Sequence, residues 1–335
     1  MNICDKIAYS RNVTHHVSTT KKIIGLVILT AFFLSPAFAE AVNYGFTLSP
    51  YIGILYGHSE EIVYKDPPYQ NFYLSELLWD LKPLVYAGLV ADYGPLDNSG
   101  TQGFIAALSF KAGLPARTGI LENRDWLNPD KDFVTWYSRH DTYSRTAVLV
   151  DASAGYFWRF AGSLAFGAYG EFSFMHFSWS GKDGYRQYTS GTPEGFPPWD
   201  SSLPKSYYTG EVIQYRQNWF VLSPGVSLNW DMNRLFSMKA FFNYSPLIYC
   251  ATRDDHLLMG TTFLDYPYFG HYLKAGGELF LSASTNTSLS LFLSYNYITG
   301  PRGDTFQGGR RVAEDGAGAA HSSLDLGLAV KFRLK

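Results

Sequence analysis

Apolar and polar side chains alternate in this chain over runs of about ten residues. In the last run one face carries Leu324, Leu326, Leu328, Val330, Phe332 and Leu334, and the other carries Ser323, Asp325, Gly327, Lys331 and Arg333. Similar alternation runs through 237–245 and 288–297. A strand with one face toward lipid and one toward a lumen requires this period of two. Because a bilayer offers no water to edge hydrogen bonds, such a sheet must close on itself. The pattern therefore predicts a transmembrane β-barrel.

The first 39 residues read as a cleaved secretory signal peptide. Lys21 and Lys22 precede an apolar run of 16 residues, from Ile23 to Phe38, and small residues follow in the Ala37-Phe38-Ala39 cleavage motif. The run is too short for a comfortable membrane helix, which needs about 20 apolar residues. An exported chain with this leader would retain residues 40–335 as a single barrel domain.

Export also changes the cysteine count and the charge. Cys4 lies in the leader, so Cys250 remains alone and cannot form an intramolecular disulfide. The leader removes four of the 27 Lys and Arg residues and one of the 29 acidic residues, which moves the formal charge from −2 to −5. An acidic chain of this kind gives no support to nucleic-acid binding.

Turn signals indicate how many strands the barrel has. Short turns are expected near 94–98, 161–163, 232–234 and 285–286, and long polar loops near 58–70, 113–142, 182–210, 253–263 and 301–317. These connections define ten antiparallel strands, with the short turns periplasmic and the long loops extracellular. Trp158 and Trp230 stand beside short turns, where an interfacial aromatic girdle is expected. A soluble β-sandwich is disfavoured, because strands of roughly 20 residues far exceed the usual five or six.

Two polar clusters fall where expected strands run into long loops. Asn123 and Asp125 share one face of an extended chain, as do Asp254 and His256. Each pair alone is most simply explained as a solvated loop. Together they suggest a hydrolytic site, because a carboxylate can orient an imidazole that takes a proton from water. The remaining histidines show no metal-ligand spacing and no cysteine pair is present, so we expect no metal site.

The mature sequence resembles the omptin family of ten-stranded outer-membrane proteases over essentially its whole length. The resembling stretches are Gly57-His58-Ser59-Glu60-Glu61-Ile62-Val63-Tyr64, Ser75-Glu76-Leu77-Leu78-Trp79, Asn123-Arg124-Asp125-Trp126, Ser138-Arg139-His140, Arg253-Asp254-Asp255-His256 and Gly316-Ala317-Gly318. The resemblance implies an extracellular groove in which water, held between a histidine and aspartates, attacks a peptide bond without a covalent intermediate. By position, Asp125 matches the second aspartate of one motif, Asp254 the orienting aspartate and His256 the base. Glu61 matches a glutamate that lines the pocket for a basic substrate residue.

Two departures from the family pattern bear on activity. Asn123 replaces the first aspartate of the family motif; it can hydrogen-bond water but cannot share a proton with Asp125. Loss of that carboxylate is expected to make Asp125 easier to ionise. Thr252 replaces the second acid of the basic pocket, so a weaker attraction for Arg or Lys is expected. The resemblance also implies lipopolysaccharide as an activating lipid partner, although the basic residues that would bind it cannot be placed in this sequence. A monomer is the default expectation.

Residue parity adds one structural condition. Lipid-facing residues are even-numbered from Met238 to Tyr244, which by simple continuation would turn Asp254 and His256 outward. Asn123 and Asp125, by the same count from Phe104, face inward. The two clusters can meet only if one strand slips by a residue, and a bulge near Pro246 would provide this slip. We therefore predict an irregularity between Ser245 and Thr252.

Three functions remain open at this point. The first is an omptin-type endopeptidase that cleaves near basic residues. The second is an omptin-like barrel that cleaves poorly or not at all and serves as an adhesin or structural protein, which the Asn123 replacement motivates. The third, a pore, ranks last because side chains tend to fill the narrow lumen of a small barrel.

Overall fold

A computed structural model describes residues 44–95 and 101–334. The expected signal peptide, residues 1–39, and much of the short turn near 94–98 lie outside these residues. The strands are β1 (Tyr44–Tyr64), β2 (Tyr73–Pro95), β3 (Gln102–Gly113), β4 (Ala116–Asp125), β5 (Trp136–Ala161), β6 (Leu164–Tyr188), β7 (Ser206–Tyr207), β8 (Glu211–Asp231), β9 (Phe236–Ser245), β10 (Ile248–His256), β11 (Thr261–Asp265), β12 (His271–Ser282), β13 (Thr287–Thr299), β14 (Arg302–Gln307) and β15 (Arg310–Leu334).

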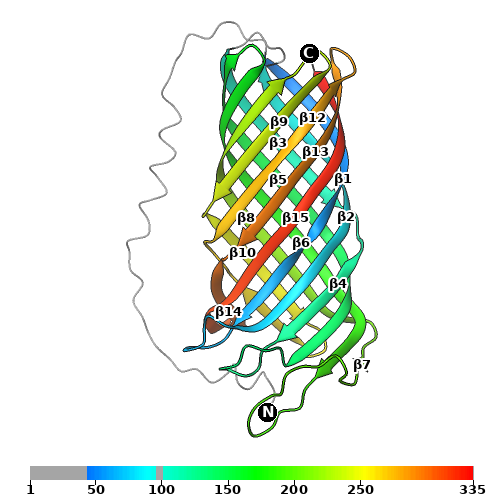
Figure 1. The fold of residues 1–335 in the computed structure, drawn as a ribbon, viewed down its shortest axis with the longest axis vertical. Coiled ribbons are helices and arrows are strands. Elements are labelled where there is room, and N and C mark those ends of the chain that lie inside the picture. The colour runs from blue at the N-terminus through cyan, green and yellow to red at the C-terminus, as the bar shows by residue number, and fades with distance from the viewer. Residues whose placement is uncertain (1–43, 96–100, 335) are drawn as a thin grey trace.

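The strands form one closed antiparallel sheet. Neighbouring strands of the sheet pair antiparallel, and β15 pairs with both β13 and β1, so the first and last strands close the ring (Figure 1). Several ring members are interrupted once, so that β3 with β4, β9 with β10, β11 with β12 and β13 with β14 each act as one long strand. The expected ring of ten strands is confirmed.

An apolar belt surrounds the end of the barrel that carries the short turns. Leu291, Leu326 and the other outward residues of the alternating runs are exposed, whereas the serines between them are buried. Trp158 and Trp230 are each 42% exposed beside the short turns, as a girdle requires. No helix in the described part of the chain is long and apolar enough to cross a membrane.

The strands continue well past this belt, into segments that the sequence assigned to loops. The expected loop 113–142 contains all of β4 and the start of β5, and the expected loop 253–263 contains the end of β10 and the start of β11. Outward residues here are charged, as Arg253 and Asp255 are on β10. Water contacts both faces of a sheet beyond the bilayer, so the alternation that marks a strand disappears although the strand itself persists.

The predicted irregularity near Pro246 is confirmed. Both β9 and β10 pair with β8, but the stretch from Asn243 to Ile248 is one residue longer than the stretch from Val221 to Gly225 opposite it. The extra residue reverses the parity. Odd-numbered residues such as Asn243 point inward before the break, and even-numbered residues, including Asp254, point inward after it.

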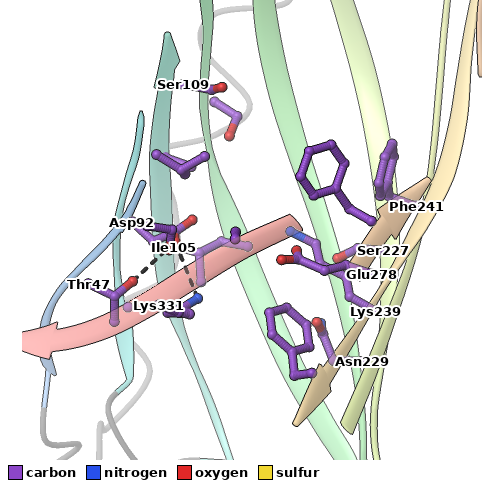
Figure 2. A pocket seen from close by; sticks show the side chains of 18 of the residues that line it. Thr47, Asp92, Ile105, Ser109, Ser227, Asn229, Lys239, Phe241, Glu278 and Lys331 are labelled. Carbon is purple, nitrogen blue, oxygen red and sulfur yellow. Dashed lines mark hydrogen bonds and ion pairs between the residues drawn. The ribbon is translucent and has the colours of Figure 1, made fainter. Parts of the chain in front are cut away.

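Side chains divide the barrel interior into two zones. A cavity of about 490 Å³ opens among polar residues at the short-turn end, where Lys331 forms an ion pair with Asp92 and Thr47 donates a hydrogen bond to the same carboxylate (Figure 2). Toward the other end the lumen is filled by a cluster of fully buried residues that includes Trp79, Trp179 and Trp219. This filling weighs against the pore interpretation and forms the floor of the site described next.

Candidate active site

The two polar clusters of the sequence face each other at the end of the barrel that extends beyond the belt. Strand β4 lies between β2 and β5, and its register sets Asp125 opposite Ser75 on one side and Trp136 on the other. Strand β10 lies between β8 and β11, with Asp254 opposite Tyr215 and Phe263. We call the space between these two walls the groove. Beneath it lies an aromatic floor, in which Trp79 stacks on Tyr215 with ring centroids 5.6 Å apart.

Asp254 and His256 form a close pair on β10. The Asp254 carboxylate contacts Nε2 of His256, and the Asp254 side chain is nearly inaccessible to solvent, whereas 30% of the His256 side chain is exposed. Burial alone would lower the pKa of His256. The hydrogen bond and charge of Asp254, together with the charges of Asp125 and Asp255, outweigh burial and raise this pKa. The pair therefore has the geometry of an imidazole oriented by a buried carboxylate.

Asp255, between these two residues, has a different setting. Its carboxylate accepts hydrogen bonds from Arg253 at 2.8 Å and from the Thr262 hydroxyl at 2.6 Å on the outer surface of the sheet. The Arg253 hydrogen bond is the largest influence, and it holds the pKa of Asp255 at about 2. Asp255 thus anchors β10 to β11 from outside and does not enter the groove.

Asp125 lies across the groove from His256, and burial is the largest influence on its pKa. Burial raises the pKa of Asp125 to about 6, and it outweighs the lowering by Ser75, His256 and Asn123. A hydrogen bond from Asn123 favours the ionised form of Asp125, but the net shift of the pKa is upward because burial outweighs it. The mutual influence of Asp125 and His256 shows that the two clusters occupy one site.

The Asn123 amide is held in one orientation. Ser75 Oγ donates a hydrogen bond of 3.1 Å to Asn123 Oδ1, and Asn123 Nδ2 lies 3.5 Å from Asp125 Oδ2. The amide nitrogen therefore faces Asp125, and its second N–H remains available to the groove.

A cluster of acids lies beside the pair on β10. Glu61 on β1 and Asp254 lie within hydrogen-bonding reach of each other, and Glu61 Oε2 and Asp254 Oδ1 are buried with no donor among the described residues. Burial, with the charges of Asp254 and Asp265, raises the pKa of Glu61 well above its usual value. The neighbouring negative charges thus favour the protonated form of Glu61.

The third member of this cluster, Asp265, was missed from the sequence. Asp265 on β11 pairs with Thr252 on β10, and its carboxylate accepts a hydrogen bond of 2.9 Å from the Thr252 hydroxyl. Burial raises the pKa of Asp265 to about 6. An acid thus stands one strand away from the position where Thr252 replaces the family acid, and only the pairing of β10 with β11 brings it there. The expected weakening of the basic pocket does not follow from Thr252 alone.

No group of three or more His, Cys, Asp or Glu side chains that could hold a metal ion occurs among residues 44–95 and 101–334. Cys250 is free and buried beneath the site.

Comparison with known proteins decides the family. The family model described as the omptin family matches residues 42–334. The chain belongs to the omptin family. No curated protein matches the sequence. The omptins are a family of outer-membrane proteases, and the barrel of this chain is an outer-membrane barrel.

Solved structures agree with the fold of this family. The outer membrane protease OmpT of Escherichia coli superposes with a TM-score of 0.77, covering 88% of this chain and 99% of its own, at 17% sequence identity. That identity establishes the shared fold alone. The toluene transporter TodX of Pseudomonas putida gives a TM-score of 0.30 at 10% identity, covering 87% of this chain and 90% of its own. The attachment invasion locus protein Ail of Yersinia pestis gives 0.27 at 12% identity, covering 86% and 99%. These two TM-scores are too low to support an argument.

Proposed function

We propose that this omptin is an active endopeptidase of the outer membrane, with its groove on the extracellular side. The observation that carries the proposal is the buried Asp254 carboxylate in contact with His256, facing Asp125 across the groove. A barrel needs no such arrangement for its stability, because a buried acid beside an imidazole costs desolvation energy.

The proposed chemistry uses water as the nucleophile. His256, held at Nε2 by Asp254, accepts a proton from water through its other ring nitrogen, and the hydroxide oxygen attacks the carbonyl carbon of the peptide. Asp125 and the free N–H of Asn123 position the water from the opposite wall. The protonated imidazole then gives its proton to the leaving amine as the C–N bond breaks. Asp254 stabilises the imidazolium in between.

The acid cluster supports a preference for a basic side chain next to the cleaved bond. Glu61 and Asp265 flank Asp254 in a buried pocket that holds several carboxyl groups and, among the described residues, no ion-pair partner for Glu61 or Asp265. A guanidinium or ammonium group would favour the ionised forms of Glu61 and Asp265, whose pKa values burial raises, and each carboxylate would form a charge-assisted hydrogen bond to the cation. Arg and Lys are therefore the proposed residues at this position.

A second candidate is a barrel that has lost efficient catalysis and acts as an adhesin or structural protein. Asn123 favours this alternative, because it removes one carboxylate from the site. Lipopolysaccharide is the proposed activating partner for the first candidate, and the monomer is the proposed working unit for both.

The deciding experiment is cleavage of quenched fluorescent peptides by the refolded barrel, with and without lipopolysaccharide. We expect cleavage next to Arg or Lys that is lost in His256→Ala. If the unsubstituted barrel cleaves nothing under either condition, Asn123→Asp should be tested. Restored cleavage would then identify Asn123 as the cause of inactivity, and continued failure would favour the adhesin.

A further inference from the structure

A cation, Arg186, lies on the wall of the groove that carries Asp125. Strand β5 joins β4 to β6, and the registers set Asn123 opposite Ser138, and Ser138 opposite Arg186 on β6. Arg186 is thus level with Asn123, two strands further along the wall. Among the described residues it forms no ion pair within 4.0 Å.

A bulge turns Arg186 toward the inside. Phe177 and Trp179 are the inward residues of β6, which would send even-numbered residues outward. The register between β5 and β6 shifts by one residue between Arg139 and Asp141, where Asp183 and Gly184 adopt positive φ angles of 54° and 91°. A Cβ at Gly184 would lie 2.0 Å from the Arg139 carbonyl oxygen, so this position requires glycine. After the bulge the even-numbered residues face the groove.

Aromatic rings hold the guanidinium in place. Trp136 stacks on Tyr188 with ring centroids 4.2 Å apart, and the Arg186 guanidinium lies 5.0 Å from the Tyr188 ring and 5.4 Å from the Tyr208 ring. Tyr208 packs against the buried core and lies 5.8 Å from the inward-facing His140 ring. Arg186 also forms a side-chain hydrogen bond with the Tyr188 hydroxyl. A guanidinium has five N–H donors, so further N–H groups remain for a ligand.

The charge on this wall therefore changes from negative to positive between β1 and β6. Paired strands run in the order β1, β2, β4, β5, β6, with Glu61 on the first, Asp125 near the middle and Arg186 on the last. Asn123 and Arg186 are level with each other and two strand spacings apart, roughly 10 Å, which an extended peptide spans with about three residues. With a basic residue in the acid pocket, the residues after the cleaved bond would extend toward Arg186.

We propose that Arg186, between Tyr188 and Tyr208, forms a second subsite that binds an acidic side chain up to three residues after the cleaved bond. This inference rests on the proposed endopeptidase function and specifies its substrate: a segment with a basic residue before the bond and Asp or Glu after it. A carboxylate accepts two parallel hydrogen bonds from the planar guanidinium, which a neutral amide cannot match.

The test measures binding separately from cleavage. Two peptides, capped at both ends so that no terminal carboxylate competes, carry one Arg and differ only in Asp or Asn at the third position after it. Their affinities for the His256→Ala barrel are measured by fluorescence anisotropy. We expect the Asp peptide to bind about three- to tenfold more tightly. The advantage should fall to near one in His256→Ala/Arg186→Gln and be partly retained in His256→Ala/Arg186→Lys.

Arg139→Gln is the matched control, because it removes a cation from the outer face of the same wall; it should keep the Asp advantage. Equal binding of the two peptides, or an advantage that survives Arg186→Gln, overturns the subsite, as does failure of both peptides to bind. Cleavage by the unsubstituted barrel is read in parallel. Selective binding without any cleavage would overturn the endopeptidase while supporting the Arg186 subsite.

Discussion

The Thr252 hydroxyl donates a 2.9 Å hydrogen bond to the carboxylate of Asp265 on the neighbouring strand. This bond places an acid beside the position at which other family members are expected to carry one. In the proposed pocket for a basic residue, the acids are then Glu61 and Asp265, from strands β1 and β11.

Asp265→Asn should reduce kcat/KM for peptides with Arg at the cleaved bond by roughly 10- to 100-fold, because one charge-assisted contact to the cation is lost. Peptides with a neutral residue there should lose far less. The double variant Thr252→Asp/Asp265→Thr should recover most of the loss. Asp304→Asn, which removes a half-buried acid paired with Arg311, is the control. Equal losses for Arg and neutral peptides would contradict the pocket.

Removing the proposed base should abolish most of the catalysis. His256→Ala is expected to lower kcat by about 10²- to 10⁴-fold, the range that general-base catalysis supplies, with a smaller change in KM. His58→Ala is the matched control, since the partner of His58 is Glu60, at 3.1 Å, and not Asp254. Steady-state kinetics on one quenched peptide is the measurement. Activity that survives His256→Ala would require another base.

The pH dependence of kcat/KM should rise from acid to neutral. Below about pH 6 Asp125 takes up a proton, and His256, whose pKa is raised above its usual value, must lose its proton before it can act as a base. Because the Asp254 charge favours the imidazolium, Asp254→Asn should lower the pKa of His256 and move the acid limb to lower pH, with a reduced maximum. If the acid limb of the pH profile does not move in Asp254→Asn, ionisation of His256 is not its origin.

Asn123→Asp should raise the pKa of Asp125, whereas Asp254→Asn should lower that of His256. A second carboxyl group beside Asp125 disfavours ionisation, so the pKa of Asp125 should rise further above about 6. The part of the acid limb due to Asp125 should then move to higher pH. The same pH–rate series measures this shift, and Asp130→Asn in the exposed loop after β4 is the control. A downward shift would show that Asn123 does not lie against Asp125.

The bulge at Pro246 depends on Ser245. The buried Ser245 Oγ donates to the Leu222 carbonyl oxygen at 2.6 Å and accepts from the Leu247 N–H at 2.8 Å, so one side chain joins both strands at the slip. Ser245→Ala should lower the free energy of unfolding by about 1–3 kcal/mol, because the buried partners lose their hydrogen bonds. Denaturant unfolding of the refolded barrel in detergent measures it. Ser290→Ala is the control, because Ser290 Oγ is buried and has no hydrogen-bond partner within residues 44–95 and 101–334, so its loss should change little.

Local pattern was sufficient for much of the fold. The alternation in 288–297 and 323–334 predicts lipid-facing strands, and it does so because a bilayer imposes opposite polarity on successive side chains. The proline at 246, combined with the required inward direction of Asp254, was enough to predict the slip. Beyond the bilayer both faces of the sheet contact water. The alternation is therefore absent from β4, the end of β10 and the start of β15, and the sequence alone predicts loops there.

The candidate site divides in the same way. The residue pairs Asn123 and Asp125, and Asp254 and His256, could be identified from the sequence, because each pair lies within one strand and its spacing of two sets a common face. Asp265 and Arg186 could not, since each enters the groove through pairing with a strand and through a register that local sequence does not encode. The sequence by itself determined a ten-stranded membrane barrel with an Asp–His pair. The tertiary structure decided which charges meet in the groove, because closure of the sheet, and the bulges within it, set the direction of every side chain beyond the membrane.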